Sequence, residues 1–172
     1  MKPEDSANVC EVEQSKLVEL DLAEATKKIL ASLPRMCVLS VSFSSEKGTF
    51  PTLNEYCQSN GLPHIAGGEM LYRIGTDEGS QICLTRGVGH VIAVDPKGAH
   101  KQRFVNSDIA LFLEVLELYR QYSVSVRSKA EDEAVVLVAQ TVDKMREMDP
   151  DAFSDSDSWW PCVADQMEFG ML

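Results

Sequence analysis

Residues 69–105 read EMLYRIGTDEGSQICLTRGVGHVIAVDPKGAHKQRFV, and this stretch decides the fold class. Four short runs within it, at 69–75, 81–85, 90–95 and 101–105, are apolar or alternate between apolar and polar residues, and they predict strands. Each of the three connections contains glycine, which readily adopts the positive φ angles of tight turns. Strands joined so closely run antiparallel, so the stretch predicts a β-meander.

The hairpin between the second and third of these strands also predicts a register. If Thr85 pairs with His90, then Leu84 lies opposite Val91 on one face of the sheet, while Cys83 points to the other face. The third strand is apolar on both faces. We therefore expect it to be central in the sheet and covered on each side.

Helical patterns dominate the rest of the chain. Apolar residues at three- and four-residue spacing, with capping residues and proline or glycine stops, predict helices at 21–33, 52–59, 109–122 and 130–148, and a last helix that ends at 169. The run 36–43 predicts one further strand. These elements indicate an α+β fold, with one central antiparallel β-sheet (a meander) flanked by helices.

Composition divides the chain into a tail and one domain. Residues 1–14 are polar and acidic and predict a disordered tail, and residues 15–172 are of a size for a single domain. Tandem tryptophans, Trp159 and Trp160, predict that the last segment docks on the core rather than extending into solvent.

Charge is unevenly distributed. The 172 residues include 16 basic and 27 acidic ones, for a net charge of −11, and this balance disfavours direct nucleic-acid binding. Residues 131–172 alone hold eleven acidic and two basic residues. Such a bias is typical either of a solvated helix face or of a surface that meets a basic partner.

The sequence contains no apolar run near the ~20 residues of a membrane span and no secretory signal at its start. Its five cysteines show no CxxC or other metal spacing. These features predict a cytoplasmic protein that does not bind a membrane.

Catalytic and cofactor chemistry have little support in the sequence. The nearest nucleophile–base pair is Cys83 with His90, but a cysteine in the middle of a strand is usually a packing residue. The three histidines are scattered, and the glycines at 87–89 lead into a strand rather than a helix, so they predict a turn and not a phosphate-binding loop. We expect no catalytic residue, no cofactor and no metal.

Several short motifs occur in a definite order. An upstream GLP precedes an IG-x-D strand end, an I-x-L strand, an FVNS segment that leads into a helix, and a WW pair before an acidic helix; these lie at 61–63, 74–77, 82–84, 104–107 and 159–160. In this order and spacing they resemble the SUKH superfamily, and more narrowly its subgroup of immunity proteins found beside bacterial polymorphic toxins. Asp108 stands where a second serine is usual, and it can still cap the helix.

The resemblance implies an α+β fold and a non-catalytic, protein-binding function. Immunity members neutralise toxin domains, often nucleases or nucleic-acid deaminases, by binding them. The alternative is a regulatory or signalling adaptor of the same fold, and an enzyme with an unrecognised site or a small-ligand binder is less favoured. The partner we expect is a basic toxin domain, because such toxins grip phosphates. We expect its contacts on the sheet face and at three acidic residues, Asp155, Asp157 and Glu168.

Overall fold

The computed structural model describes residues 9–35, 37–98 and 102–170. Within these ranges the strands are β1 (Cys37–Val38), β2 (Val41–Phe43), β3 (Leu71–Asp77), β4 (Ser80–Thr85), β5 (Val91–Val94) and β6 (Gln102–Asn106). The α-helices are α1 (Gln14–Val18), α2 (Glu24–Leu30), α3 (Leu53–Ser59), α4 (Ile109–Val126), α5 (Glu131–Met148) and α6 (Trp159–Glu168), with short 3₁₀ turns η2 (Gly68–Met70) and η3 (Pro150–Phe153). The α+β class predicted from the sequence is confirmed.

The sheet is a meander from end to end. The six described strands pair antiparallel in sequence order, β1-β2-β3-β4-β5-β6. The register of the central hairpin is the predicted one, since Leu84 lies opposite Val91 and the Thr85 N–H donates to the His90 carbonyl at 2.9 Å. The glycine-containing turn between β4 and β5 therefore predicts the register of these two strands correctly.

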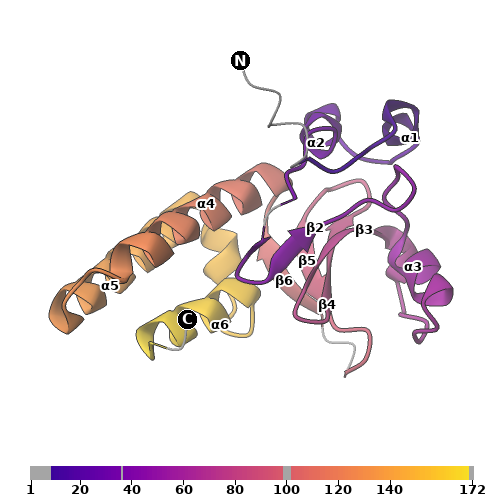
Figure 1. The fold of residues 1–172 in the computed structure, drawn as a ribbon. Helices are drawn as coiled ribbons and strands as arrows, with labels where there is room; N and C mark the ends of the chain where they lie inside the picture. The colour runs from indigo at the N-terminus through magenta and orange to yellow at the C-terminus, as the bar shows by residue number, and fades with distance from the viewer. Residues whose placement is uncertain (1–8, 36, 99–101, 171–172) are drawn as a thin grey trace, which may run out of the picture.

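Helices cover both faces of the sheet. Figure 1 shows α4, α5 and α6 on one side of the strands and α3 on the other, with α1 and α2 beside one end of the sheet. All four residues of β5 are buried: Val91 and Ala93 belong to the main core, whereas Ile92 and Val94 pack with the side chains of α3. This confirms that the third strand of the predicted meander is covered on both sides.

Helix starts follow the capping rules where the sequence offers a cap. The Asp108 carboxylate accepts the Leu111 N–H at 2.8 Å at the start of α4. Thr52 and Glu55 form a reciprocal capping box at the start of α3. These two caps satisfy backbone N–H groups at the starts of the two helices, which pack on opposite faces of the sheet.

The N-terminal segment differs from the predicted disordered tail. Residues 1–8 lie outside the described residues, but Val9 forms a β-bridge with Pro34 and the side chain of Cys10 is buried. The Cys10 N–H donates to the Leu33 carbonyl at 2.9 Å. Val9 and Cys10 thus contact the rest of the fold, although the segment around them is polar. Ordered contacts therefore begin before residue 14.

The predicted helix at 21–33 is shorter in the structure. Helix α2 begins at Glu24, after an Ala23 N-cap that supplies no side-chain hydrogen bond. Leu20 and Leu22 are buried in the main core on either side of Asp21. This stretch is non-helical, so the helix begins three residues later than the predicted start at 21.

The predicted strand at 36–43 is a hairpin. Val38 pairs with Val41, and the two residues between them, Leu39 and Ser40, have φ angles of 51° and 64°. Two positive φ angles define a type I′ turn, in which asparagine and glycine are the preferred residues. A leucine–serine pair does not signal this turn in the sequence, so the break in the strand was missed.

Gly75 explains one of the family-like motifs. A Cβ atom at this position would lie 2.5 Å from the Ser42 carbonyl oxygen, because β2 crosses close to β3 there. Real Cβ atoms do not approach backbone so closely, so the IG-x-D pattern requires glycine at 75 for packing and not for turn formation.

We expect Ser40→Gly to stabilise the protein by roughly 0.5–1 kcal/mol, since glycine adopts a left-handed conformation without steric cost. Ser40 is exposed, and the side-chain contact it would lose is a 3.2 Å hydrogen bond to the Glu78 carboxylate. Urea unfolding monitored by circular dichroism would measure the change in midpoint.

The matched control is Ser42→Gly in the adjacent strand. Ser42 is exposed and lies in β2, where glycine should lower stability because it increases the chain entropy lost on folding. Equal losses in both variants would contradict the assignment of strain to Ser40.

Candidate functional site

The three predicted contact residues lie at the two ends of one helix. Asp155 and Asp157 are in the turn before α6, where the Asp155 carboxylate accepts the Asp157 N–H at 2.9 Å. Glu168 is the last residue of α6. A ten-residue helix rises about 15 Å, so Glu168 is not in one cluster with the two aspartates.

The central strands of the sheet offer no free face for the predicted contact. In β3, β4 and β5 consecutive residues are buried, which means that both faces of these strands are covered. A contact on the sheet itself is therefore left only to the outer strands, where Ser42 of β2 and Gln102 of β6 are exposed. The helices that cover the sheet leave the available surface on their own outer sides.

Trp159 and Trp160 dock the last helix on the core, as predicted. Their rings meet edge to face with centroids 4.6 Å apart, and Trp160 is fully buried. The Trp159 indole N–H donates to the Asp77 carboxylate at 3.0 Å. Burial raises the pKa of Asp77 above its ordinary value, although the hydrogen bond from Trp159 opposes this shift.

A polar network joins the end of β6 and the start of α4 to the end of α5 and the start of α6. The Asp149 carboxylate accepts hydrogen bonds from the Asn106 amide at 2.8 Å and from both the N–H and the hydroxyl of Ser107, at 2.8 and 2.7 Å. The Asn106 oxygen in turn accepts the Trp160 indole N–H at 2.8 Å. We call these four residues, Asn106, Ser107, Asp149 and Trp160, the C-terminal pin.

The C-terminal pin explains two residues of the FVNS motif by the hydrogen bonds that they make. Asn106 and Ser107 are the N and S of that motif, and Asp149 is 2% exposed. In the sequence, Asp149 is simply the residue between the predicted helix at 130–148 and Pro150. Its partners lie more than forty residues away, so no local pattern identifies it as a ligand for them.

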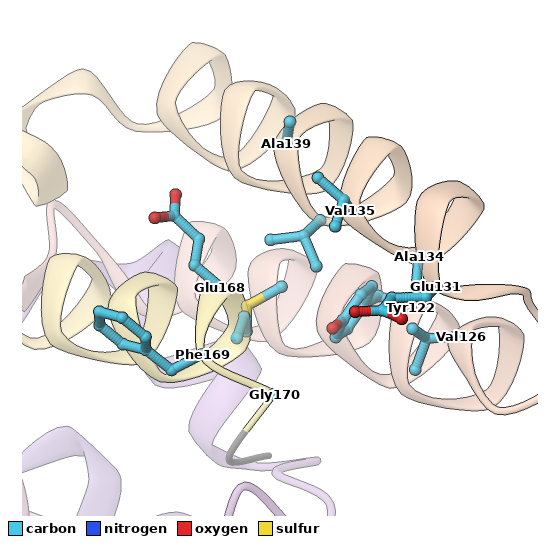
Figure 2. Close-up of a pocket in the computed structure, with 11 residues that line it drawn as sticks. Tyr122, Val126, Glu131, Ala134, Val135, Ala139, Glu168, Phe169 and Gly170 are labelled. Atoms are coloured by element: carbon cyan, nitrogen blue, oxygen red, sulfur yellow. The ribbon is translucent and has the colours of Figure 1, made fainter.

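The helices held by this pin enclose a groove between α4, α5 and the end of α6. Its volume is about 470 Å³. We call it the three-helix groove, and most of its lining is apolar: Tyr122, Val126, Glu131, Ala134, Val135, Val138, Ala139, Met167, Glu168, Phe169 and Gly170. Figure 2 shows Val135 on α5 and Glu168 at the end of α6 among the side chains that line this groove.

The groove combines exposed apolar side chains with acidic ones. Val135 is 64% exposed and Phe169 is 76% exposed, and both line the same groove. The charged residues in the lining are Glu131 and Glu168, both acidic. Of the three residues predicted from the sequence, only Glu168 belongs to this groove.

The nucleophile considered in the sequence is a packing residue. Cys83 is completely buried among the side chains that face α3, and burial raises the pKa of its thiol far above the ordinary value. The His90 ring packs edge to face on Phe104, with centroids 5.5 Å apart. An inaccessible thiol with a raised pKa is a poor nucleophile.

Over the described ranges, no three His, Cys, Asp or Glu side chains gather in a way that could hold a metal ion. The same part of the chain contains no helix long and apolar enough to cross a membrane.

The fold is thus an α+β meander that carries helices on both faces, and its buried polar clusters tie elements of the fold together. The profile of the SUKH-4 immunity protein family matches residues 4–166, and the chain belongs to this family. The resemblance noted in the sequence is therefore confirmed, and the match extends over the N-terminal helices as well. No significant match was found among curated proteins or among solved structures.

Proposed function

We propose that the protein neutralises a toxin by binding it directly, and that the toxin is a basic domain of the nuclease or nucleic-acid deaminase type. Membership of the SUKH-4 immunity protein family supports the immunity role. In this proposal the protein is not an enzyme and uses no cofactor, because occupying the toxin's surface is enough to block it.

The observation that carries the proposal is the charge of the C-terminal helices. Residues 131–172 hold eleven acidic and two basic residues, and α5 and α6 place many of them in solvent. A toxin that grips nucleic acid presents basic groups to phosphates. An acidic protein surface competes for the same groups and also speeds the encounter.

Asp155, Asp157 and Glu168 are the contacts we propose within this surface. All three are exposed, and they belong to α6 or to the turn before it. Cys10, Cys57, Cys83 and Cys162 are free thiols, which fits a proposed site of action in the reducing cytoplasm.

The test is co-expression with the protein encoded by the gene adjacent to this chain's gene, followed by binding kinetics at several salt concentrations. We expect host survival and a complex whose affinity falls as salt rises. The triple variant Asp155→Asn, Asp157→Asn, Glu168→Gln removes three charges without changing side-chain shape. It should slow association about three- to tenfold at low salt, since steering is the main contribution of such charges.

The matched control removes three charges elsewhere: Glu11→Gln, Glu13→Gln, Glu19→Gln. These residues are exposed near α1, which lies far from α6 in Figure 1. Association that slows equally in both triple variants would reject the proposed contacts. Absence of both rescue and complex would reject neutralisation by direct binding, and a non-toxin client in a pull-down would favour the adaptor role.

A further inference from the structure

We infer that the three-helix groove is the docking site for a basic, amphipathic helical segment of the toxin, which inserts an apolar side chain beside Val135 and places Lys or Arg near Glu131 and Glu168. This inference rests on the proposed function and names the surface of the protein at which the toxin would bind. It shares Glu168 with the contacts proposed above, whereas Asp155 and Asp157 lie outside the groove.

The apolar part of the groove is open to a partner. Its floor is formed by Val138 and Met167, which are buried, whereas Val135 and Phe169 remain more than half exposed at its rim. Residues that merely complete a helix–helix contact become buried in it. Exposed apolar side chains around a hollow instead mark a surface that gains from being covered.

Helix stability explains only one of the two groove carboxylates. Glu131 is in the first turn of α5, where the helix dipole favours an acidic residue. Glu168 is the last residue of α6, where the dipole disfavours negative charge, and the last turn of α6 contains no basic residue. The position of Glu168 therefore needs an explanation other than the stability of its own helix.

The two carboxylates also lack cationic partners among the described residues. The basic residue that comes shortly before α5, Lys129, pairs with Glu133 at 3.5 Å and not with Glu131. No lysine or arginine lines the groove. In Figure 2, Glu168 and Glu131 lie on either side of Val135, so acidic groups flank the apolar centre. A partner with the reverse pattern, apolar in the middle and basic at the flanks, complements this arrangement.

The shape of the groove favours a helical segment. Along α5 the lining runs from Glu131 to Ala139, which is about two turns or 12 Å. A groove of that length between helices matches the helix-in-groove mode, in which apolar residues at three- and four-residue spacing enter the groove and polar residues stay at its edges.

The first experiment compares Val135→Asp with Val136→Asp in binding to the toxin domain encoded by the neighbouring gene. Both valines are exposed on α5, at 64% and 56%, and only Val135 lines the groove. We expect Val135→Asp to raise the dissociation rate at least tenfold, because a carboxylate would then face the inserted apolar side chain. Val136→Asp should stay within about twofold of wild type.

The second experiment reverses the groove charges. Glu131→Lys with Glu168→Lys should slow association at low salt about tenfold and flatten its salt dependence. The control is Glu114→Lys with Glu147→Lys, two exposed residues of α4 and α5 that lie outside the groove. Thermal unfolding of each free variant checks that folding is unchanged.

The outcomes separate this inference from the proposed function. If wild-type protein binds the toxin and both groove variants bind as well as their controls, the groove is not the docking site and neutralisation by binding stands. If wild-type protein does not bind the toxin, both proposals are rejected. A selective loss in the groove variants supports both.

Discussion

Replacing Trp160 with alanine is expected to lower the free energy of unfolding by about 4 kcal/mol, which is in the range for deletion of a buried tryptophan or phenylalanine. The side chain is fully buried, and its loss would also leave the Asn106 oxygen without its 2.8 Å hydrogen bond. Because small proteins have only about 5–15 kcal/mol of stability, this single change removes a large share of it. Thermal and urea unfolding would measure the loss.

A milder variant keeps this prediction testable if Trp160→Ala does not fold. Trp160→Phe retains most of the ring but not the N–H, so we expect a loss of about 2 kcal/mol. The control is Phe169→Ala at the residue that follows the end of α6. It removes an aromatic side chain that is 76% exposed and should cost less than about 0.5 kcal/mol. Similar losses at 160 and 169 would show that α6 is not anchored through Trp160.

Replacing Asp149 with alanine is expected to cost about 3 kcal/mol, because it leaves buried donors of Asn106 and Ser107 without an acceptor. Asp149 is 2% exposed, so water cannot readily take the place of the carboxylate. Urea unfolding monitored by tryptophan fluorescence would report the change, since Trp160 belongs to the same network.

Two further variants test the prediction for Asp149, one at the same position and one at a nearby exposed residue. Asp149→Asn keeps one oxygen acceptor and the shape of the side chain, so its loss should be about 1–2 kcal/mol. Asp151→Ala, two residues along the chain and exposed, should change stability by less than about 0.5 kcal/mol. A loss at Asp151 as large as at Asp149 would contradict the pin.

The features predicted from sequence are those set by local chemistry. The glycine turn at 86–89 fixed the register of β4 and β5, and Asp108 caps α4 as expected. In both cases residues a few positions apart determine the structure. The hairpin at Leu39 and Ser40 was missed because its residues do not favour the positive φ angles that the surrounding packing imposes on them.

The binding surface was harder to predict, since it depends on which helices come together. Acidic residues at the C-terminal end were visible in the sequence, but a net charge does not show which carboxylates face a groove. In the sequence, Val135 is one of several apolar residues of a predicted helix. Only the placement of α6 beside α5 shows that it lines the three-helix groove. Of the predicted contacts, Glu168 alone lies there.

The order of strands has a consequence for folding during synthesis. Strands β3 to β6 pair with their neighbours in sequence through short connections, so this part of the sheet can form early and fast, whereas β2 and β3 are separated by the segment that contains α3. Asn106, by contrast, must wait for Asp149 and Trp160, which follow 43 and 54 residues later. At the ~5–20 residues per second of protein synthesis, that delay is roughly 3–10 s. The sheet is therefore expected to be complete on the ribosome before the helices that form the groove are locked in place, and protection against a toxin would begin only when the last of the chain emerges.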